Sequence, residues 1–85
     1  MEKITELYET AEMMNNESYN ERFKAEYLQL KIRMRKLNEF LVKYKNNELN
    51  FTPNCSYDLL KGQFKAMDLY ASYLEERALI ENVNI

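Results

Sequence analysis

The clearest pattern along the chain is a heptad repeat of apolar residues between positions 23 and 44. Apolar side chains recur there at alternating intervals of four and three residues, at Phe23, Tyr27, Leu30, Met34, Leu37, Leu41 and Tyr44. This spacing gathers them on one side of an α-helix and predicts a helix over about 19–46. Ser18 and Glu21 fit a capping box at its start, with Ser18 as the N-cap residue.

A second repeat with the same intervals follows the single proline. Its apolar positions are Leu60, Phe64, Met67, Ala71, Leu74 and Ala78. They predict a helix over about 56–81, capped by Ser56 or Thr52. The connection is rich in asparagine and contains Pro53, which favours a turn. Because the two repeats share one period and are joined by a short connection, we expect an antiparallel helical hairpin.

A short amphipathic helix is predicted before the hairpin, over about 2–14. One face of it carries Ile4, Leu7, Tyr8, Ala11 and Met14. A helix of this length is marginal in water by itself, so it must dock on another element. The first long helix offers an apolar surface outside its heptad seam, formed by Leu28, Ile32, Phe40 and Val42. We expect a further helix or another subunit to cover that surface.

A glycine and the last four residues lie outside the heptad pattern of the second half of the chain. Gly62 lies inside a predicted helix, where glycine costs about 1 kcal/mol relative to alanine. It either permits the close approach of another backbone or a ligand, or is a tolerated small residue. Residues 82–85 follow the last heptad position, and we expect them to fray.

Composition supports an all-α fold and makes other classes improbable. Hydrophobic residues form 46% of the 85 residues, which is enough for a core, while one Gly and one Pro are too few for the turns of a β-sandwich or barrel. We therefore expect a single helical domain over 1–85. So short a chain buries a limited core without disulfides or metals, and self-association is the usual remedy. A homo-oligomer is expected.

Several kinds of chemistry have no residues to support them. The chain contains no His and one cysteine, Cys55, so a structural zinc site, a histidine base and an internal disulfide are not expected. It has no glycine-rich phosphate loop and no nucleophile–base pair. We expect no enzyme, no cofactor and no metal. The first residues lack a signal-peptide pattern, and no apolar run is long enough to span a bilayer, so we expect a cytoplasmic protein without membrane contact.

Charge is concentrated in the first long helix. Residues 1–17, 18–46 and 47–85 carry net charges of −4, +5 and −3. Arg22, Lys24 and Arg33 of the basic segment are candidate donors to a phosphate-bearing ligand. The alternative is that these cations pair with acids of the two flanking helices. Duplex nucleic acid is disfavoured, because the acidic flanks of a chain with a pI near 5.2 would repel a long polyanion.

Tyrosine is unusually frequent, with seven residues. Those at or near the heptad positions fit core packing. Tyr19 and Tyr57 instead lie at the starts of the two long helices, where free N–H groups attract anions and an exposed ring can stack on a nucleobase. Gln63 could read a base edge. Tyr19, Arg22, Lys24, Arg33, Tyr57 and Gln63 are therefore the candidate ligand-binding residues.

The pattern of both long helices resembles a family of small phage proteins found in crAss-like and other phages. The resemblance covers residues 20–78 and rests on Phe23-x-x-Glu26-Tyr27-x-x-Leu30-x-x-Arg33-x-x-Lys36-Leu37-x-x-Phe40-Leu41 and on Leu59-Leu60-x-x-Gln63-x-x-Ala66-Met67-x-x-Tyr70-x-x-x-Leu74-x-x-Arg77. If it holds, the chain acts in the cytoplasm of a bacterial host.

A more distant similarity is to the helical-hairpin sponges with which phages bind cyclic-nucleotide immune signals, the anti-CBASS type. It rests on Arg22-Phe23-Lys24 and on Gly62-Gln63-Phe64-Lys65-Ala66-Met67, where the Gly and Gln stand in the opposite order to the sponge motif. This similarity implies an oligomer that sequesters a cyclic di- or trinucleotide between subunits without hydrolysing it.

Two other functions fit the same residues. An anti-CRISPR-type inhibitor would bind a host defence protein through the second apolar surface of the first long helix. It could also use the acidic N-terminal helix, whose Glu2, Glu6, Glu9 and Glu12 would mimic nucleic-acid charge. A coiled-coil adaptor would oligomerise and bind no ligand.

Overall fold

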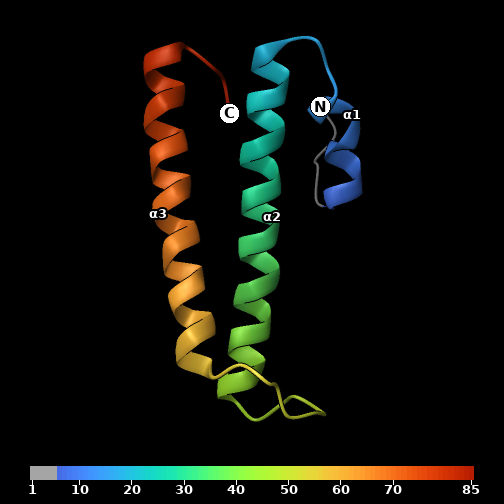
Figure 1. Cartoon of the computed structure of the whole chain (residues 1–85), viewed down its shortest axis with the longest axis vertical. Helices are drawn as coiled ribbons and strands as arrows, with labels where there is room; N and C mark the ends of the chain where they lie inside the picture. Colours follow the sequence, from blue (N-terminus) through green and yellow to red (C-terminus); the bar gives the residue numbers. More distant parts are fainter. Residues whose placement is uncertain (1–5) are drawn as a thin grey trace.

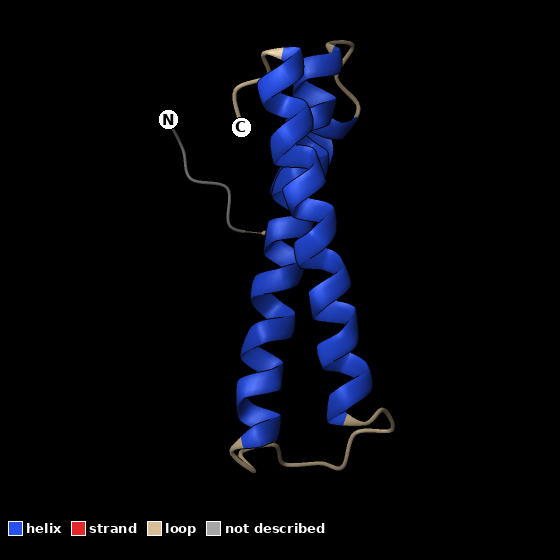
Figure 2. Ribbon diagram, turned by 90° about the vertical axis from the view of Figure 1, so that its left-hand side faces the viewer, coloured by secondary structure: helices blue, strands red, loops and turns tan. Residues whose placement is uncertain are grey.

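Two long helices form an antiparallel pair, and a short helical segment lies along one of them (Figure 1). A computed structural model describes residues 6–85. It contains η1 (Leu7–Thr10), α1 (Ala11–Met14), α2 (Tyr19–Lys45) and α3 (Tyr57–Glu81). The described part of the chain contains no strand (Figure 2). The all-α fold with a long helix pair is confirmed; positions 2–5 of the predicted first helix lie outside the described residues.

The two heptad repeats meet along an inner seam between α2 and α3. Its buried members are Phe23, Leu30, Met34, Ala71, Leu74, Ala78 and Val83, with Tyr27, Phe64 and Met67 packed against them. Leu74 is 1% exposed. Burying one such large side chain contributes about 1.5–3 kcal/mol, so the seam is the main source of stability.

The second apolar surface of α2 is covered from within the chain at Ile32, whereas Val42 at its other end is 51% exposed. Ala25 and Ile32 are 0% and 5% exposed on the side of α2 that η1 and α1 contact. Thr10, fully buried there, accepts a hydrogen bond at 2.9 Å from the side chain of Gln29. The expectation that a further helix would cover this surface is confirmed for its upper part.

The helix caps agree with the sequence at α3 and differ at α2. Ser56 accepts a hydrogen bond from the backbone N–H of Leu59 at 3.1 Å, as predicted. Ser18 is the N-cap of α2, but its side chain makes no capping hydrogen bond. Glu21 pairs at 3.4 Å with Lys24 instead of turning back to the backbone. The predicted capping box is therefore wrong, because a neighbouring cation attracts the carboxylate more strongly than a neutral N–H.

The C-terminal segment is folded back rather than frayed, as Figure 1 shows for its course toward α2. Asn82 adopts a left-handed conformation with φ 56°, which ends α3. The N–H of Val83 then donates to the carbonyl of Ala78 at 2.9 Å, and the Val83 side chain is 6% exposed in the core. The expectation of fraying is wrong at Val83, since this helix-ending turn returns an apolar residue to the seam.

Candidate ligand-binding edge of the helical hairpin

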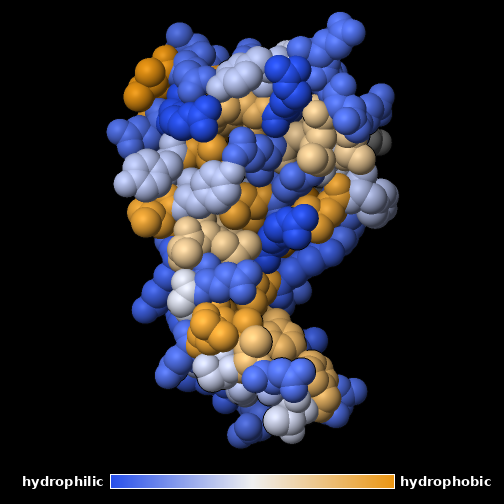
Figure 3. Space-filling view, in the orientation of Figure 1, coloured by the Kyte–Doolittle hydropathy of each residue, from blue (hydrophilic) through white to orange (hydrophobic). Residues whose placement is uncertain are grey.

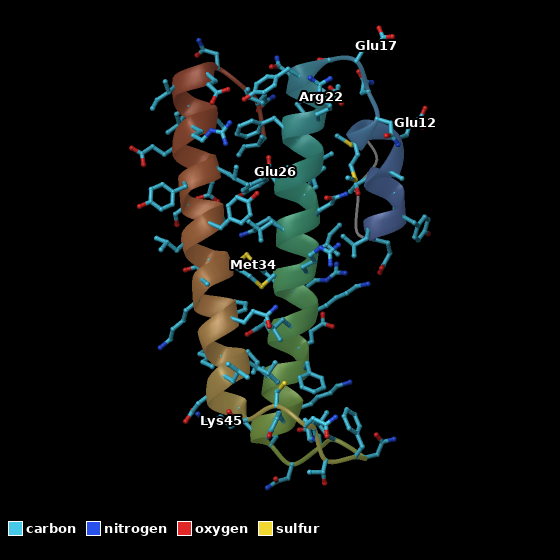
Figure 4. The ribbon with its side chains drawn as sticks, in the orientation of Figure 1. Glu12, Glu17, Arg22, Glu26, Met34 and Lys45 are labelled. Carbon is cyan, nitrogen blue, oxygen red and sulfur yellow. The ribbon has the colours of Figure 1, made fainter. Side chains whose placement is uncertain are left out.

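One long edge of the hairpin carries polar contacts between α2 and α3 at heptad intervals. At the open end, the Arg77 guanidinium donates to the hydroxyl oxygen of Tyr19 at 3.1 Å. Seven residues along each helix, the Tyr70 hydroxyl donates to the carboxylate of Glu26. Glu26 lies between the two helices in Figure 4. In an antiparallel pair, equal steps along both helices keep such residues facing each other.

The next step along each helix reaches Arg33 of α2 and Gln63 of α3, which lie on the same edge of the hairpin. Each lies seven residues, about 10 Å of helix, beyond the contact of Glu26 with Tyr70. Both are exposed, and neither makes a hydrogen bond or ion pair with another residue of 6–85. Two of the six candidate residues thus share one surface with their polar groups free. We call the surface formed by the following residues the Arg33 edge: Tyr19, Glu26, Arg33, Gln63, Tyr70 and Arg77.

The open end of the Arg33 edge is held by a network around Glu81. The Tyr19 hydroxyl donates to Oε1 of Glu81 at 2.5 Å, and Nε of Arg77 lies 3.2 Å from Oε2. The hydrogen bond from Tyr19, together with Arg77, lowers the pKa of Glu81. The same hydrogen bond raises the pKa of Tyr19. The Tyr19 ring is 47% exposed and meets Phe23 edge-on, so one ring face stays available for stacking.

Two further candidate residues are held by neighbours in the sequence. The Nη1 atom of Arg22 donates to the backbone carbonyls of Asn16 and Glu17, at 2.8 and 2.7 Å. Arg22 therefore fixes the linker between α1 and α2. Lys24 pairs with Glu21 and follows Phe23 in the heptad, which places it on the opposite edge of the hairpin from Arg33.

Tyr57 lies at the closed end of the hairpin, far from Tyr19. Its ring packs edge-to-face on Tyr44, with ring centroids 5.8 Å apart, and lies 6.0 Å from the ammonium of Lys45. Arg22 and Lys45 mark the two ends of α2 in Figure 4. The 27 residues of α2 span about 40 Å. Tyr19 and Tyr57 of one chain therefore do not reach the same small ligand.

Part of the positive charge of α2 is neutralised by the N-terminal segment. Lys36 donates to Glu6 at 2.8 Å, and Arg35 lies 3.7 Å from the same carboxylate and 3.8 Å from Glu39. The hydrogen bond from Lys36 lowers the pKa of Glu6, and its charge adds to the effect. Lys36 and Arg35 therefore pair with an acid of the N-terminal segment, which is the alternative to ligand binding given for the cations of this helix.

An open cavity of about 510 Å³ lies where α2 meets the α2–α3 connection. Phe40 and Phe51 line it with ring centroids 6.2 Å apart, next to Lys36 and Lys43. Phe51 comes from the asparagine-rich connection, so heptad analysis did not select it. The signal in the sequence is a single Phe within an otherwise polar segment.

Other kinds of site have no residues to form them in 6–85. This part of the chain contains no cluster of three or more side chains able to hold a metal ion, and no helix long and apolar enough to cross a membrane. Cys55 is exposed with a free thiol.

Comparison with known protein families identifies the family to which the chain belongs. The family model described as Sequestin matches residues 17–80, which are 64 of the 85 residues. The chain belongs to the Sequestin family. The matched segment spans α2 and all of α3 but its last residue, and it includes all six residues of the Arg33 edge. The name of the Sequestin family describes sequestration, which is binding rather than chemical conversion. No curated protein and no solved structure matches the chain.

Proposed function

We propose that this member of the Sequestin family is a phage counter-defence protein that sequesters a cyclic oligonucleotide immune signal in the host cytoplasm without catalysis. The observation that carries the proposal is that Arg33 and Gln63, on one edge of the hairpin, are both exposed and make no hydrogen bond or ion pair with another of residues 6–85. A basic group on the same edge as a free amide suits a ligand that carries both phosphates and bases.

Each group on the Arg33 edge has a role that its chemistry supports. The planar guanidinium of Arg33 donates two hydrogen bonds to a phosphate. The Gln63 amide both donates and accepts, as recognition of a base edge requires. The ring of Tyr70, 44% exposed, supplies a stacking surface near this pair, whereas the ring of Tyr19, 47% exposed, lies about 21 Å along α2 from Arg33.

An inhibitor that binds a host defence protein directly is the second candidate function. Its first expected surface, the second apolar side of α2, is covered at Ala25 and Ile32 and does not offer a free docking face there. Glu6 of the acidic helix is engaged by Lys36. Glu12 and Glu17 remain exposed and point away from α2 in Figure 4, and they are what favours this function. Fewer residues support it than support ligand sequestration.

Native mass spectrometry with a panel of cyclic di- and trinucleotides tests the proposal. The purified chain should gain the mass of an intact cyclic nucleotide at a fixed stoichiometry, and the ligand should be recovered unhydrolysed. If no member of the panel binds, the proposal fails. If a host defence protein instead copurifies stoichiometrically and independently of nucleotides, the inhibitor function replaces it.

Substitutions on the two edges of α2 locate the site. Arg33→Ala should weaken binding at least tenfold, since a hydrogen bond to a charged group contributes about 1.5–3 kcal/mol. Gln63→Ala should weaken it by about two- to tenfold, since a neutral hydrogen bond contributes about 0.5–1.5 kcal/mol. Lys43→Ala removes an equal charge from an exposed position outside the Arg33 edge and serves as the matched control. Equal losses in Arg33→Ala and Lys43→Ala, with no loss in Gln63→Ala, would mean that only net charge matters, and the assigned edge would be wrong.

A further inference from the structure

The side of α3 that faces away from α2 carries another heptad repeat. We call the following positions, at alternating intervals of three and four residues, the outer stripe: Leu59, Gly62, Ala66, Leu69, Tyr73, Glu76 and Ile80. They lie about half a turn around α3 from the inner seam. The large apolar members are Leu59, Leu69, Tyr73 and Ile80, at 63%, 58%, 60% and 76% exposed. Figure 3 shows separate hydrophobic patches in the upper part of this outer border, with hydrophilic side chains between them.

The outer stripe exposes enough apolar surface for a specific contact. With about 200 Å² for a fully exposed large side chain, these four residues leave on the order of 500 Å² per chain in water. Two such stripes facing each other would bury roughly 1,000 Å² before the flanking residues are counted. Standard interfaces bury about 1,200–2,000 Å² in total, so a second copy of this chain approaches that range.

Small residues at one end of the outer stripe leave room for a neighbouring helix. No heavy atom lies within 4 Å of the place where a Cβ of Gly62 would stand. The glycine therefore serves no close approach inside the chain, although it weakens the helix. Ala66, at the next stripe position, is also exposed. The large Tyr73 and Leu69 follow toward the other end.

We infer that the outer stripe is the interface of a homodimer in which α3 packs antiparallel against α3 of a second copy. In this arrangement Tyr73 of the partner subunit lies over Gly62, and Leu69 of the partner subunit lies over Ala66. The twofold axis repeats both contacts. Large side chains then fill the space above small ones along the stripe, as close packing requires.

The position of Glu76 favours antiparallel over parallel packing. In a parallel pair Glu76 faces its own copy, and two like charges meet inside the seam. In the antiparallel pair Glu76 lies opposite Leu59 of the partner subunit, in the first turn of that helix. The start of a helix attracts a carboxylate through its dipole and free N–H groups.

The antiparallel dimer also completes the ligand-binding edge, and this step rests on the proposed function. Gln63 and Arg77 belong to the Arg33 edge and directly follow Gly62 and Glu76 of the outer stripe. Antiparallel packing therefore brings the Arg33 edges of both copies to one side of the dimer. Tyr70 of the partner subunit then lies about two residues along the helix from Gln63, and Arg77 of the partner subunit about five residues away in the other direction. Each of the two equivalent sites combines a phosphate donor and amide from one chain with an arginine and a tyrosine ring from the other.

The mass of the protein in solution tests the dimer without any ligand. Sedimentation equilibrium should give twice the chain mass at micromolar concentration. Tyr73→Glu should give the monomer while the helical circular-dichroism spectrum is retained. Leu79→Glu is the matched control, because Leu79 is 82% exposed on the same helix but outside the stripe. A monomeric wild-type chain overturns the inference, as does a Tyr73→Glu variant that stays dimeric.

Disulfide trapping tests the direction of packing. In a Cys55→Ser background, Gly62→Cys and Tyr73→Cys chains are mixed and oxidised. The antiparallel dimer should form a disulfide between the two different chains, and little when either variant is alone. Efficient trapping of each variant with itself would show a parallel dimer and overturn the proposed register.

Mixed dimers separate the composite site from the dimer itself. One chain carries Arg33→Ala with Gln63→Ala, and the other carries Tyr70→Ala with Arg77→Ala. Neither variant alone should bind a cyclic nucleotide that the wild-type chain retains. Their equimolar mixture should recover about a quarter of the wild-type sites, because half of the dimers then contain one intact site. If the wild-type dimer forms but retains no cyclic nucleotide, the proposed function fails while the dimer stands; if it binds but the mixture recovers nothing, the composite site is wrong.

Discussion

Gly62→Ala should change the stability of the chain and the affinity of the dimer in opposite directions. The added methyl group meets no atom within 4 Å in a single chain, so it causes no strain there. Alanine is favoured over glycine inside a helix by about 0.8–1.0 kcal/mol. A gain of this size in a domain of fewer than 100 residues raises the melting temperature by about 4–8 °C.

The same methyl group occupies the space that we assign to the partner's Tyr73. Inserting a methyl into a close-packed contact costs about 1–3 kcal/mol. The dimer dissociation constant should therefore rise by about five- to 150-fold. The small change is informative because the fold gains stability while the interface loses affinity.

Two measurements on the same variant check this prediction. Urea unfolding at a protein concentration below the dimer dissociation constant gives the stability of the single chain. Sedimentation equilibrium gives the affinity of the dimer. Asp68→Ala is the control, because it replaces another weak helix former at an exposed position outside the outer stripe. It should stabilise the chain and leave the dimer unchanged. No gain in stability would refute the open environment of Gly62, and an unchanged dimer affinity would remove Gly62 from the interface.

Three further substitutions test the packing and the ionisable groups. Leu74→Ala should destabilise the chain by about 3–5 kcal/mol in urea unfolding, because Leu74 is 1% exposed in the inner seam; a loss below 1 kcal/mol would contradict that packing. Burial and the hydrogen bond to Glu75 raise the pKa of Tyr27 to about 12, so stability should fall as pH rises from 10 to 12, and Tyr27→Phe should reduce this dependence to the part that Tyr19 contributes. Lys36 lowers the pKa of Glu6, so the stability from this pair should be lost as pH falls below the usual carboxylate pKa of about 4.5. Glu6→Gln should reduce the loss of unfolding free energy below this pH. If the variant loses as much stability in acid as the wild-type chain, the pair of Lys36 and Glu6 is not the cause.

The hairpin could be predicted from the sequence because the spacing of apolar residues that determines it is local and periodic. The alternation of three and four residues places Leu30 and Leu74 on the faces that meet, whatever the rest of the chain does. The start of α3 at Ser56 was predictable for the same reason, since a capping hydrogen bond involves residues three apart. Errors occurred where a local signal had a competitor: Lys24 attracts Glu21, and the turn at Asn82 returns Val83 to the core.

For the candidate binding residues, the sequence indicated which side chains have suitable chemistry. It did not indicate which of them lie close together in the fold. Tyr19 and Tyr57 both start helices, yet antiparallel packing sends them to opposite ends of the hairpin. Arg33 and Gln63 are 30 positions apart in the chain, and only the pairing of α2 with α3 places them on one edge. The aromatic cavity at Phe40 and Phe51 likewise depends on the path of the connection.

The sequence by itself determined the helices, their faces and the positive charge of α2, because each of these follows from the order of residues along a helix. The tertiary structure decided which cations are neutralised, which apolar surface is covered and which remains open. Docking of the N-terminal segment engages Lys36 and buries Ile32, whereas the outer side of α3 stays exposed. Helical periodicity assigns a residue to a face, but only the packing of all the elements determines what that face meets.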